Sequence, residues 1–256
     1  GDGLSGCIVD VFNDYIVIQS AAYWVEEHRS TIEKVFLRLI KEHPFLSDNM
    51  KLIWKRSSSR LTQDGFVIPK DDPLNVSEKA SLSVVIEENG VKYEISPYID
   101  QKTGFYCDQR ENRHLIRSFV YQKHVLDLFS YTGGFSLNAA LHGNPLSVTA
   151  VDSSSQAIER AKHNYELNKN DASSSTLPSI NFLEGDAINI MKQLKEEGKE
   201  YDFIVCDPPK LAPTKQSLQK ARHKYQQINL LAMNLINSVK GGYLFTFTCS
   251  AVMSQQ

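Results

Sequence analysis

Two different spacings of apolar residues divide the chain into two parts. Alternating apolar residues predict two strands over residues 7–20 and a hairpin over residues 81–97. Apolar side chains at helical spacing predict an amphipathic helix over residues 24–42, which ends before Pro44. Short strands around one helix are typical of a small mixed domain. We therefore predict an α+β domain over residues 1–98.

From about residue 124 onward, apolar strands alternate with helical segments. Five apolar runs predict strands, beginning near residues 124, 147, 180, 201 and 242. Strands separated by helices form a parallel sheet with right-handed crossovers. The sequence therefore predicts an α/β domain with a Rossmann-like, doubly wound sheet over residues 99–256. Such a sheet usually continues beyond a fifth strand, so we also expect C-terminal strands to be missing from this chain.

Polar residues follow the predicted strands at their carboxyl ends, where sheets of this kind bind ligands. They are Asp127, Asp152, Asp186, Asp207 and Cys249. Each aspartate alone could be a helix cap or a turn residue, but five polar residues on one edge favour a site.

A small-residue turn, Ser130 to Gly134, separates the first of these strands from a helix. Its glycines let the backbone N–H groups approach a polar ligand closely. The turn has neither the G-x-G-x-x-G pattern nor the P-loop pattern. A nucleotide-dependent oxidoreductase, the general alternative for this fold, is therefore disfavoured.

The composition limits the classes of protein further. A net charge of −2 over 256 residues argues against nucleic-acid binding through bulk charge, and no apolar run is long enough to span a membrane. The four cysteines are widely separated, which favours free thiols in a reducing compartment, and the seven histidines form no metal site with them. The first residues do not resemble a signal peptide. We expect a cytoplasmic protein, or an organellar one whose transit segment was removed.

One stretch of the C-terminal half is strongly basic. Between Pro208 and Gly241 the chain has six Lys or Arg residues and no Asp or Glu. This asymmetry predicts a local phosphate-binding face, although a solvated helix face is the simpler alternative. The predicted substrate-binding residues are Lys210, Lys215, Lys220, Arg222, Lys224 and Tyr225.

Six motifs occur in the order found in a known family: IDQKTGFYCDQRENR at residues 99–113, then DLFSYTGGF, AVD, EGDA, CDPPK and FTCS. Together they resemble S-adenosylmethionine-dependent methyltransferases that act on cytosine-5 of large-subunit ribosomal RNA. These enzymes have a PUA domain, an EEHEAD-type domain and a class I methyltransferase domain. The opening DGLSGCIVDVFNDYIVIQ resembles the start of the EEHEAD-type domain, and we expect no PUA domain before Gly1. The resemblance implies S-adenosylmethionine as cofactor, S-adenosylhomocysteine as product and ribosomal RNA as substrate, and it allows a homodimer.

The resemblance also implies a set of cofactor contacts. Asp127 would lie near the cofactor ammonium, Asp152 would accept hydrogen bonds from the ribose hydroxyls, and Asp186 with Ala187 would bind the adenine. Asp186 could instead only cap a helix, and residues 99–113 could instead be a loop that joins the two domains. The predicted cofactor-binding residues are Gln109, Arg110, Asp127, Ser130, Tyr131, Thr132, Gly133, Gly134, Phe135, Asp152, Ser153, Asp186, Ala187, Asp207 and Pro208.

Cytosine C5 is too weakly nucleophilic to take a methyl group directly, so a thiolate must first add to C6. Cys249 matches the nucleophile of the family, and Asp207 would bond the N3 edge of the base. Cys206 is the competing thiol, but it lies within an apolar strand and points away from Asp207, which predicts a buried structural residue. Lys210 stands where methylases of exocyclic amines carry an aromatic residue, which argues against adenine-N6 chemistry.

Two other functions remain open from the sequence. The same fold and cofactor could serve methylation of guanine or of a small molecule, neither of which needs the thiol of Cys249. The chain could also be an RNA-binding or assembly factor without catalysis, although Asp152, Asp207 and Cys249 argue against that.

Overall fold

The structure is a computed structural model that describes residues 3–44, 46–47, 49–69, 82–169, 178–211 and 218–249. Its contacts divide the chain into two compact units. The N-terminal unit comprises Gly1–Glu88 and Tyr93–Asp108, and the C-terminal unit comprises Asn89–Lys92 and Gln109–Gln256. The predicted domain boundary between residues 98 and 99 stays a prediction.

The N-terminal unit contains a three-stranded sheet. The two strands predicted over residues 7–20 are confirmed as β1 (Cys7–Phe12) and β2 (Tyr15–Ser20), which pair antiparallel. The third strand, β3 (Lys51–Arg56), pairs parallel with β2, and α3 (Ser58–Gln63) follows it. A parallel pair requires a crossover connection, which here includes the helical segment.

The helix predicted over residues 24–42 is two helices, α1 (Tyr23–Glu27) and α2 (Arg29–Glu42). They meet at His28, where φ is −98° and ψ is 13°. The prediction of one continuous helix was wrong because the apolar spacing does not reveal this local change of backbone geometry. The predicted hairpin is confirmed as β4 (Val84–Glu88) and β5 (Val91–Ile95).

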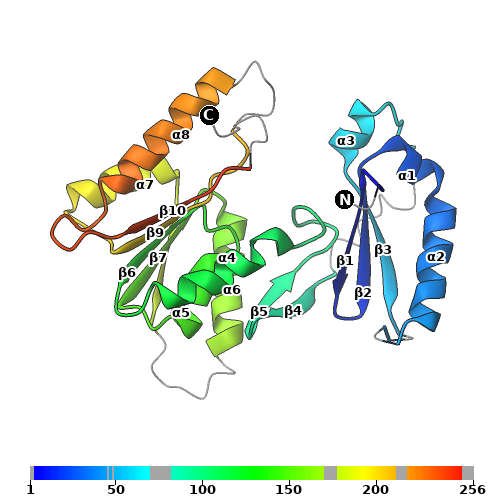
Figure 1. The fold of residues 1–256 in the computed structure, drawn as a ribbon, viewed down its shortest axis with the longest axis horizontal. Helices are drawn as coiled ribbons and strands as arrows, with labels where there is room; N and C mark the ends of the chain where they lie inside the picture. The colour runs from blue at the N-terminus through cyan, green and yellow to red at the C-terminus, as the bar shows by residue number, and fades with distance from the viewer. Residues whose placement is uncertain are drawn as a thin grey trace. The chain divides into compact units, whose positions relative to one another are not determined.

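The C-terminal unit contains the predicted parallel sheet (Figure 1). The strand order is β10-β9-β6-β7-β8, and every neighbouring pair is parallel. The chain runs outward from β6 in one direction and then returns to the other side of β6, so the strand order reverses between β6 and β9. Ligands bind at such a switch point in open α/β sheets. The strands are β6 (His124–Leu128), β7 (Ser147–Asp152), β8 (Ile180–Glu184), β9 (Phe203–Cys206) and β10 (Tyr243–Thr246).

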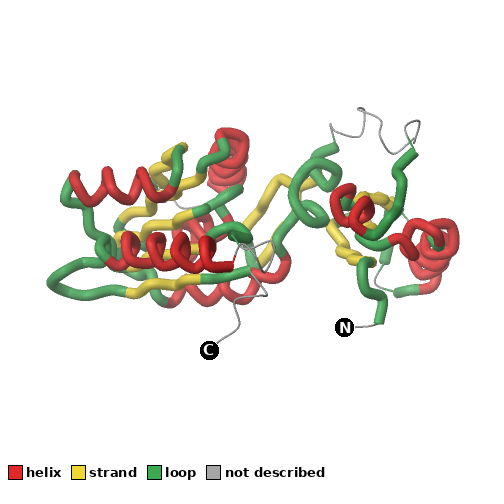
Figure 2. The backbone as a smooth tube through the Cα atoms, turned by 90° about the horizontal axis from the view of Figure 1, so that it is seen from above, coloured by secondary structure: helices red, strands yellow, loops and turns green. Residues whose placement is uncertain are grey.

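Helices cover both faces of this sheet, and the layers can be followed from two directions in Figures 1 and 2. Helices α4, α5 and α6 lie on one face, and α7 and α8 lie on the other. The helices are α4 (Arg110–Leu115), α5 (Gly134–His142), α6 (Ser155–Lys169), α7 (Ala187–Glu196) and α8 (Leu218–Met233), with the short 3-10 helices η3 (Cys107–Gln109) and η4 (Ile116–Ser118) beside α4.

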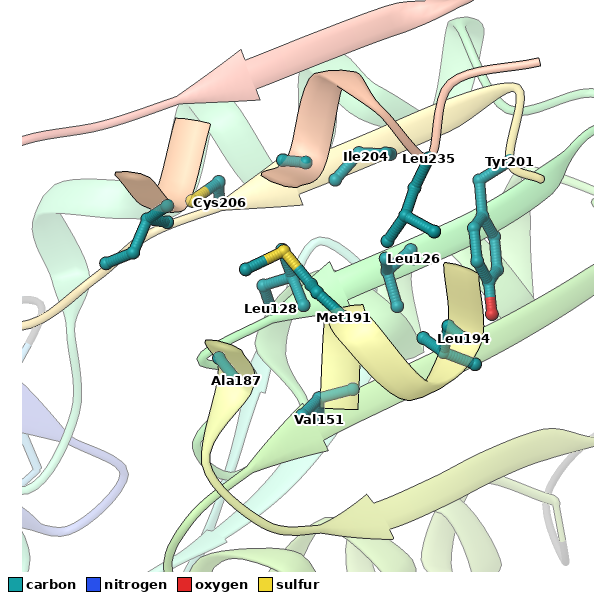
Figure 3. Packing of buried hydrophobic residues seen from close by; sticks show 12 residues of the cluster. Leu126, Leu128, Val151, Ala187, Met191, Leu194, Tyr201, Ile204, Cys206 and Leu235 are labelled. Atoms are coloured by element: carbon teal, nitrogen blue, oxygen red, sulfur yellow. The ribbon is translucent and has the colours of Figure 1, made fainter. Parts of the chain in front are cut away.

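A dry core holds α7 and α8 against the sheet. Figure 3 shows Met191 and Leu194 of α7 directed toward Leu126 and Leu128 of β6. Cys206 belongs to the same core and is fully buried. Because side chains alternate along a strand, this face of β6 is apolar, while Asp127 between the two leucines points to the opposite face. The core therefore fixes the direction of the polar side chain of β6.

Within the described residues, no helix has the length and apolarity needed to span a bilayer. The same part of the chain contains no cluster of three or more side chains suited to a metal ion.

Candidate active site

The turn between β6 and α5 has an unusual backbone. Phe129, Tyr131 and Gly133 all have positive φ, at 63°, 48° and 88°. Such values are rare for bulky residues and cost about 1–3 kcal/mol each, and they cluster at functional sites. A Cβ at Gly133 would lie 3.2 Å from the Cβ of Ala161, so this position favours glycine for both space and conformation. The turn is closed by a hydrogen bond from the Gly133 N–H to the Ser130 carbonyl.

Asp127 lies below this turn with only 1% of its surface exposed. Its Oδ2 accepts hydrogen bonds from the Ser136 N–H at 2.9 Å and from the Ser136 hydroxyl at 2.6 Å. Burial raises the pKa of Asp127 to about 7, against the lowering effect of the Ser136 bonds, and the negative charges of Asp207 and Asp152 raise it further. Three carboxylates are thus close enough to repel one another.

Two buried polar atoms beside the turn have no hydrogen-bond partner among the described residues. They are Oδ1 of Asp127 and Oγ of Ser130. A buried, unsatisfied polar atom costs about 1–3 kcal/mol, so their presence indicates a polar ligand. A cationic group would also relieve the repulsion among the carboxylates. These residues therefore fit the ammonium end of S-adenosylmethionine.

Asp152 follows β7 and is held by two backbone groups. Its Oδ2 accepts from the Tyr131 N–H and its Oδ1 from the Ser154 N–H, both at 2.9 Å. A carboxylate has about four acceptor sites, so these bonds orient Asp152 and leave capacity for two ribose hydroxyls. Ser153 is exposed beside it.

Asp186 follows β8 and caps α7, because its Oδ1 accepts from the Asn189 N–H at 3.1 Å. The capping role considered as an alternative is therefore present. It uses one oxygen of an exposed side chain, and Ala187 behind it is buried. An adenine contact through Asp186 stays a prediction.

Asp207 follows β9, and its carboxylate is contacted from the segment before β6. Nε2 of Gln109 donates to Oδ2 of Asp207 at 3.4 Å, and Nδ2 of Asn112 donates to Oε1 of Gln109 at 2.7 Å. Pro208 is buried, whereas Arg110 is exposed. The sequence did not single out Asn112, although its spacing of three residues from Gln109 on a helix was a usable signal.

Ser136 is a second residue that the sequence did not single out. It follows the glycines of the turn and lies in the first turn of α5, fully buried against Asp127. Thr132 contributes its carbonyl, which accepts from Nδ2 of Asn164 on α6 at 3.1 Å.

The two thiols of interest differ sharply in their surroundings. Burial raises the pKa of Cys206 to about 12, and the charge of Asp207 adds to the effect. This confirms the prediction of an inert, buried residue. Cys249 is exposed. Since Thr246 of β10 pairs with Cys206 of β9, both Asp207 and Cys249 continue from the carboxyl ends of two adjacent strands.

An aromatic stack connects the end of β10 to the glycine turn. The rings of Phe135 and Phe247 lie 5.6 Å apart with an interplanar angle of 22°. The Phe247 N–H also donates to the Cys206 carbonyl at 2.9 Å. Two residues before Cys249, the chain is therefore anchored to both β9 and the start of α5. The ring of Phe135 is buried in this stack.

The predicted basic face is exposed on α8 and on the loop before it. Lys210, Lys220, Arg222 and Lys224 are exposed, while Lys215 lies outside the described residues. Tyr225 is different, because it is buried and its hydroxyl donates to the Pro209 carbonyl at 3.5 Å. Tyr225 thus supports the loop after Asp207 from below and does not contribute an exposed ring to this face.

The model of a family described as S-adenosylmethionine-dependent methyltransferase matches residues 70–251. This chain therefore belongs to the S-adenosylmethionine-dependent methyltransferases. The match includes every polar residue at the carboxyl edge of the sheet.

Relatives with curated names narrow the comparison. The chain is 37% identical over 254 residues to ribosomal RNA large subunit methyltransferase I of Vibrio cholerae, and 36% identical over 253 residues to the protein of that name from Shewanella frigidimarina. These alignments cover 98–99% of the chain but only 59–60% of the relatives. The chain thus spans about three fifths of the length of the relatives it matches.

A solved structure supports the fold. The crystal structure of SMU.776 in complex with SAH superimposes with a TM-score of 0.69 at 22% sequence identity. The comparison covers 92% of this chain and 56% of that one. The Rossmann-like fold predicted from the sequence is confirmed.

Proposed function

We propose that this chain is the catalytic part of an enzyme that forms 5-methylcytosine in large-subunit ribosomal RNA. The observation that carries the proposal is the pair of Asp207 and exposed Cys249 on adjacent strand ends, beside a turn suited to the cofactor. The names of the relatives support ribosomal RNA as the substrate. The resemblance of the motifs to cytosine-5 methyltransferases supports the position of the methyl group.

The reaction would begin with the thiolate of Cys249, which attacks C6 of the cytosine and forms a C–S bond. The electron pair displaced from the C5–C6 bond moves toward N3, where a proton from Asp207 stabilises it. The cofactor supplies an activated methyl group, which C5 then takes. A base removes the C5 proton, the electron pair expels the thiolate from C6, and the N3 proton returns to Asp207.

The exposed basic residues would hold the RNA near the site. The hydrogen bond from Tyr225 of α8 to the Pro209 carbonyl connects the basic helix to the loop that carries Asp207. Phosphate contacts position a nucleic acid without reading its sequence. Bases in unpaired loops are the ones that an enzyme can reach, so an unpaired cytosine is the expected target.

The experiment is transfer of a labelled methyl group from S-adenosylmethionine to ribosomal RNA that lacks the modification, followed by nucleoside analysis. We expect the label in 5-methylcytosine, and we expect no transfer by Cys249→Ala. Cys206→Ala is the matched control, because it removes the other nearby thiol and leaves the proposed nucleophile intact. Both variants should bind the cofactor as the wild type does.

Two results would contradict the proposal. Label in another nucleoside that persists in Cys249→Ala would exclude the thiol mechanism and favour guanine methylation. Tight cofactor binding without transfer to any RNA would favour the RNA-binding or assembly role.

A further inference from the structure

Asp207 has two chemically equivalent oxygens, and the proposed reaction needs one of them to face the base. Nothing within the short loop after β9 selects between the two oxygens. A selection must therefore come from a neighbouring element. The contact from Gln109 is the described hydrogen bond that reaches this carboxylate from another element.

Gln109 caps the amino end of α4, and Asn112 lies three residues later on the same helix. Residues at this spacing are neighbours on the helix surface. Nδ2 of Asn112 donates to Oε1 of Gln109 at 2.7 Å, which occupies the acceptor end of the glutamine amide. The donor end, Nε2, then faces Asp207. The reverse orientation would direct two oxygens at each other.

We propose that Asn112 and Gln109 form an amide relay that positions Asp207 so that its Oδ1 faces the substrate base. This inference rests on the proposed function for the identity of the base. Oδ2 accepts the amide N–H of Gln109, so the proton that moves to N3 of the cytosine belongs on Oδ1. Gln109 and Asn112 are positioning residues, since they act through Asp207.

The relay also explains how Asp207 is held among repelling charges. Asp127 and Asp207 repel each other, and Cys206 lies directly before Asp207 in β9. An N–H donor stabilises the carboxylate where no cation among the described residues is recorded as its partner. The sequence-based prediction assigned Gln109 to the cofactor pocket, and the relay gives it a different role that cofactor affinity can distinguish.

The test uses three variants of the full chain: Gln109→Ala, Asn112→Asp and the double variant. In Asn112→Asp the new carboxylate can only accept, so it should draw the Gln109 amide N–H away from Asp207 while keeping the size of the side chain. We expect each single variant to slow single-turnover methyl transfer by about 10- to 100-fold at saturating cofactor. The affinity for S-adenosylmethionine should change less than about twofold.

The double variant separates a relay from two independent effects. If Asn112 acts only through Gln109, the double variant should be no slower than Gln109→Ala. Glu111→Gln is the matched control, since it changes an exposed side chain on the same helix. It should transfer at the wild-type rate. Multiplied effects in the double variant, or a loss of cofactor affinity in Gln109→Ala that accounts for its slower rate, would overturn the relay.

A second measurement does not depend on the nature of the substrate. The side-chain amide resonances of Gln109 in an NMR spectrum should shift in Asn112→Asp and in Asp207→Asn, and should stay in place in Glu111→Gln. If the wild type methylates a nucleoside other than cytosine, the proposed function fails, but the same coupled pattern would still support the relay. If no RNA is methylated, unchanged Gln109 resonances in Asn112→Asp would overturn it, and shifted resonances would support it.

Discussion

The pKa of Asp127 gives a quantitative prediction about cofactor binding. Burial raises this pKa to about 7 in the free protein. The ammonium group of S-adenosylmethionine would favour the ionised carboxylate, so binding should lower the pKa of Asp127 and release a proton when the pH is below 7. Affinity should therefore fall as the pH falls. The cofactor ammonium itself stays protonated over this range, since α-amino groups titrate near pH 8.

The size of the effect follows from the fraction of Asp127 that is ionised before binding. With a pKa of about 7, that fraction is about one half at pH 7, one eleventh at pH 6 and one hundredth at pH 5. If the bound form is fully ionised, the Kd should rise about fivefold between pH 7 and pH 6 and about ninefold more between pH 6 and pH 5. The limiting slope is tenfold per pH unit.

Titration calorimetry at pH 5, 6 and 7 in buffers of different ionisation enthalpy would measure both the Kd and the proton released. Asp127→Asn is the matched variant, because it keeps the shape and removes the titration. It should bind about 10- to 100-fold more weakly at pH 7, from the loss of a charge-assisted contact, with a nearly constant Kd across the range. A wild-type Kd that changes less than twofold from pH 7 to pH 5 would refute the reasoning. So would a variant that keeps the wild-type pH dependence.

Three further predictions follow from the same region. Without cofactor, Asp127 binds a proton more tightly in the folded than in the unfolded protein. Its contribution to the free energy of unfolding should therefore fall by about 4 kcal/mol as the pH rises from 3.8 to about 7, and Asp127→Asn should remove that decline in denaturant titrations. Gly133→Ala should destabilise the protein by about 1–3 kcal/mol and weaken cofactor binding, whereas Gly198→Ala, also at positive φ but in open space, should cost about 1 kcal/mol and leave binding intact. Iodoacetamide should modify Cys249 in the native protein and spare Cys206, with mass spectrometry of the peptides as the measurement; rapid labelling of Cys206 would contradict its burial.

The basic face of α8 can be tested by the salt dependence of RNA binding. The double variant Lys220→Gln, Lys224→Gln should lower the slope of log affinity against log salt by about one. The matched control is Lys192→Gln, Lys195→Gln, which removes the same charge from exposed positions on α7. Equal losses in the two variants would indicate a general effect of net charge and would contradict a specific phosphate-binding face.

The sequence by itself determined the type and order of most elements. The apolar runs that became β6 and β9 are buried on both faces, and this requirement is visible in the composition of each run. The same reasoning located Asp127, Asp152 and Asp207 at strand ends, and it predicted the burial of Cys206 from the alternation of side chains. These features depend on residues that are close in the sequence.

Only the tertiary structure decided which of these residues meet. The order of the strands puts β9 beside β6, and this brings the charge of Asp207 close enough to Asp127 to raise its pKa. The burial of Tyr225 under the Pro209 carbonyl and the contact from Gln109 to Asp207 likewise join segments far apart in the chain. Local spacing can predict the face on which a side chain lies. Its partner depends on how the sheet and its helices pack together, and that is settled by the burial of apolar surface over the whole unit.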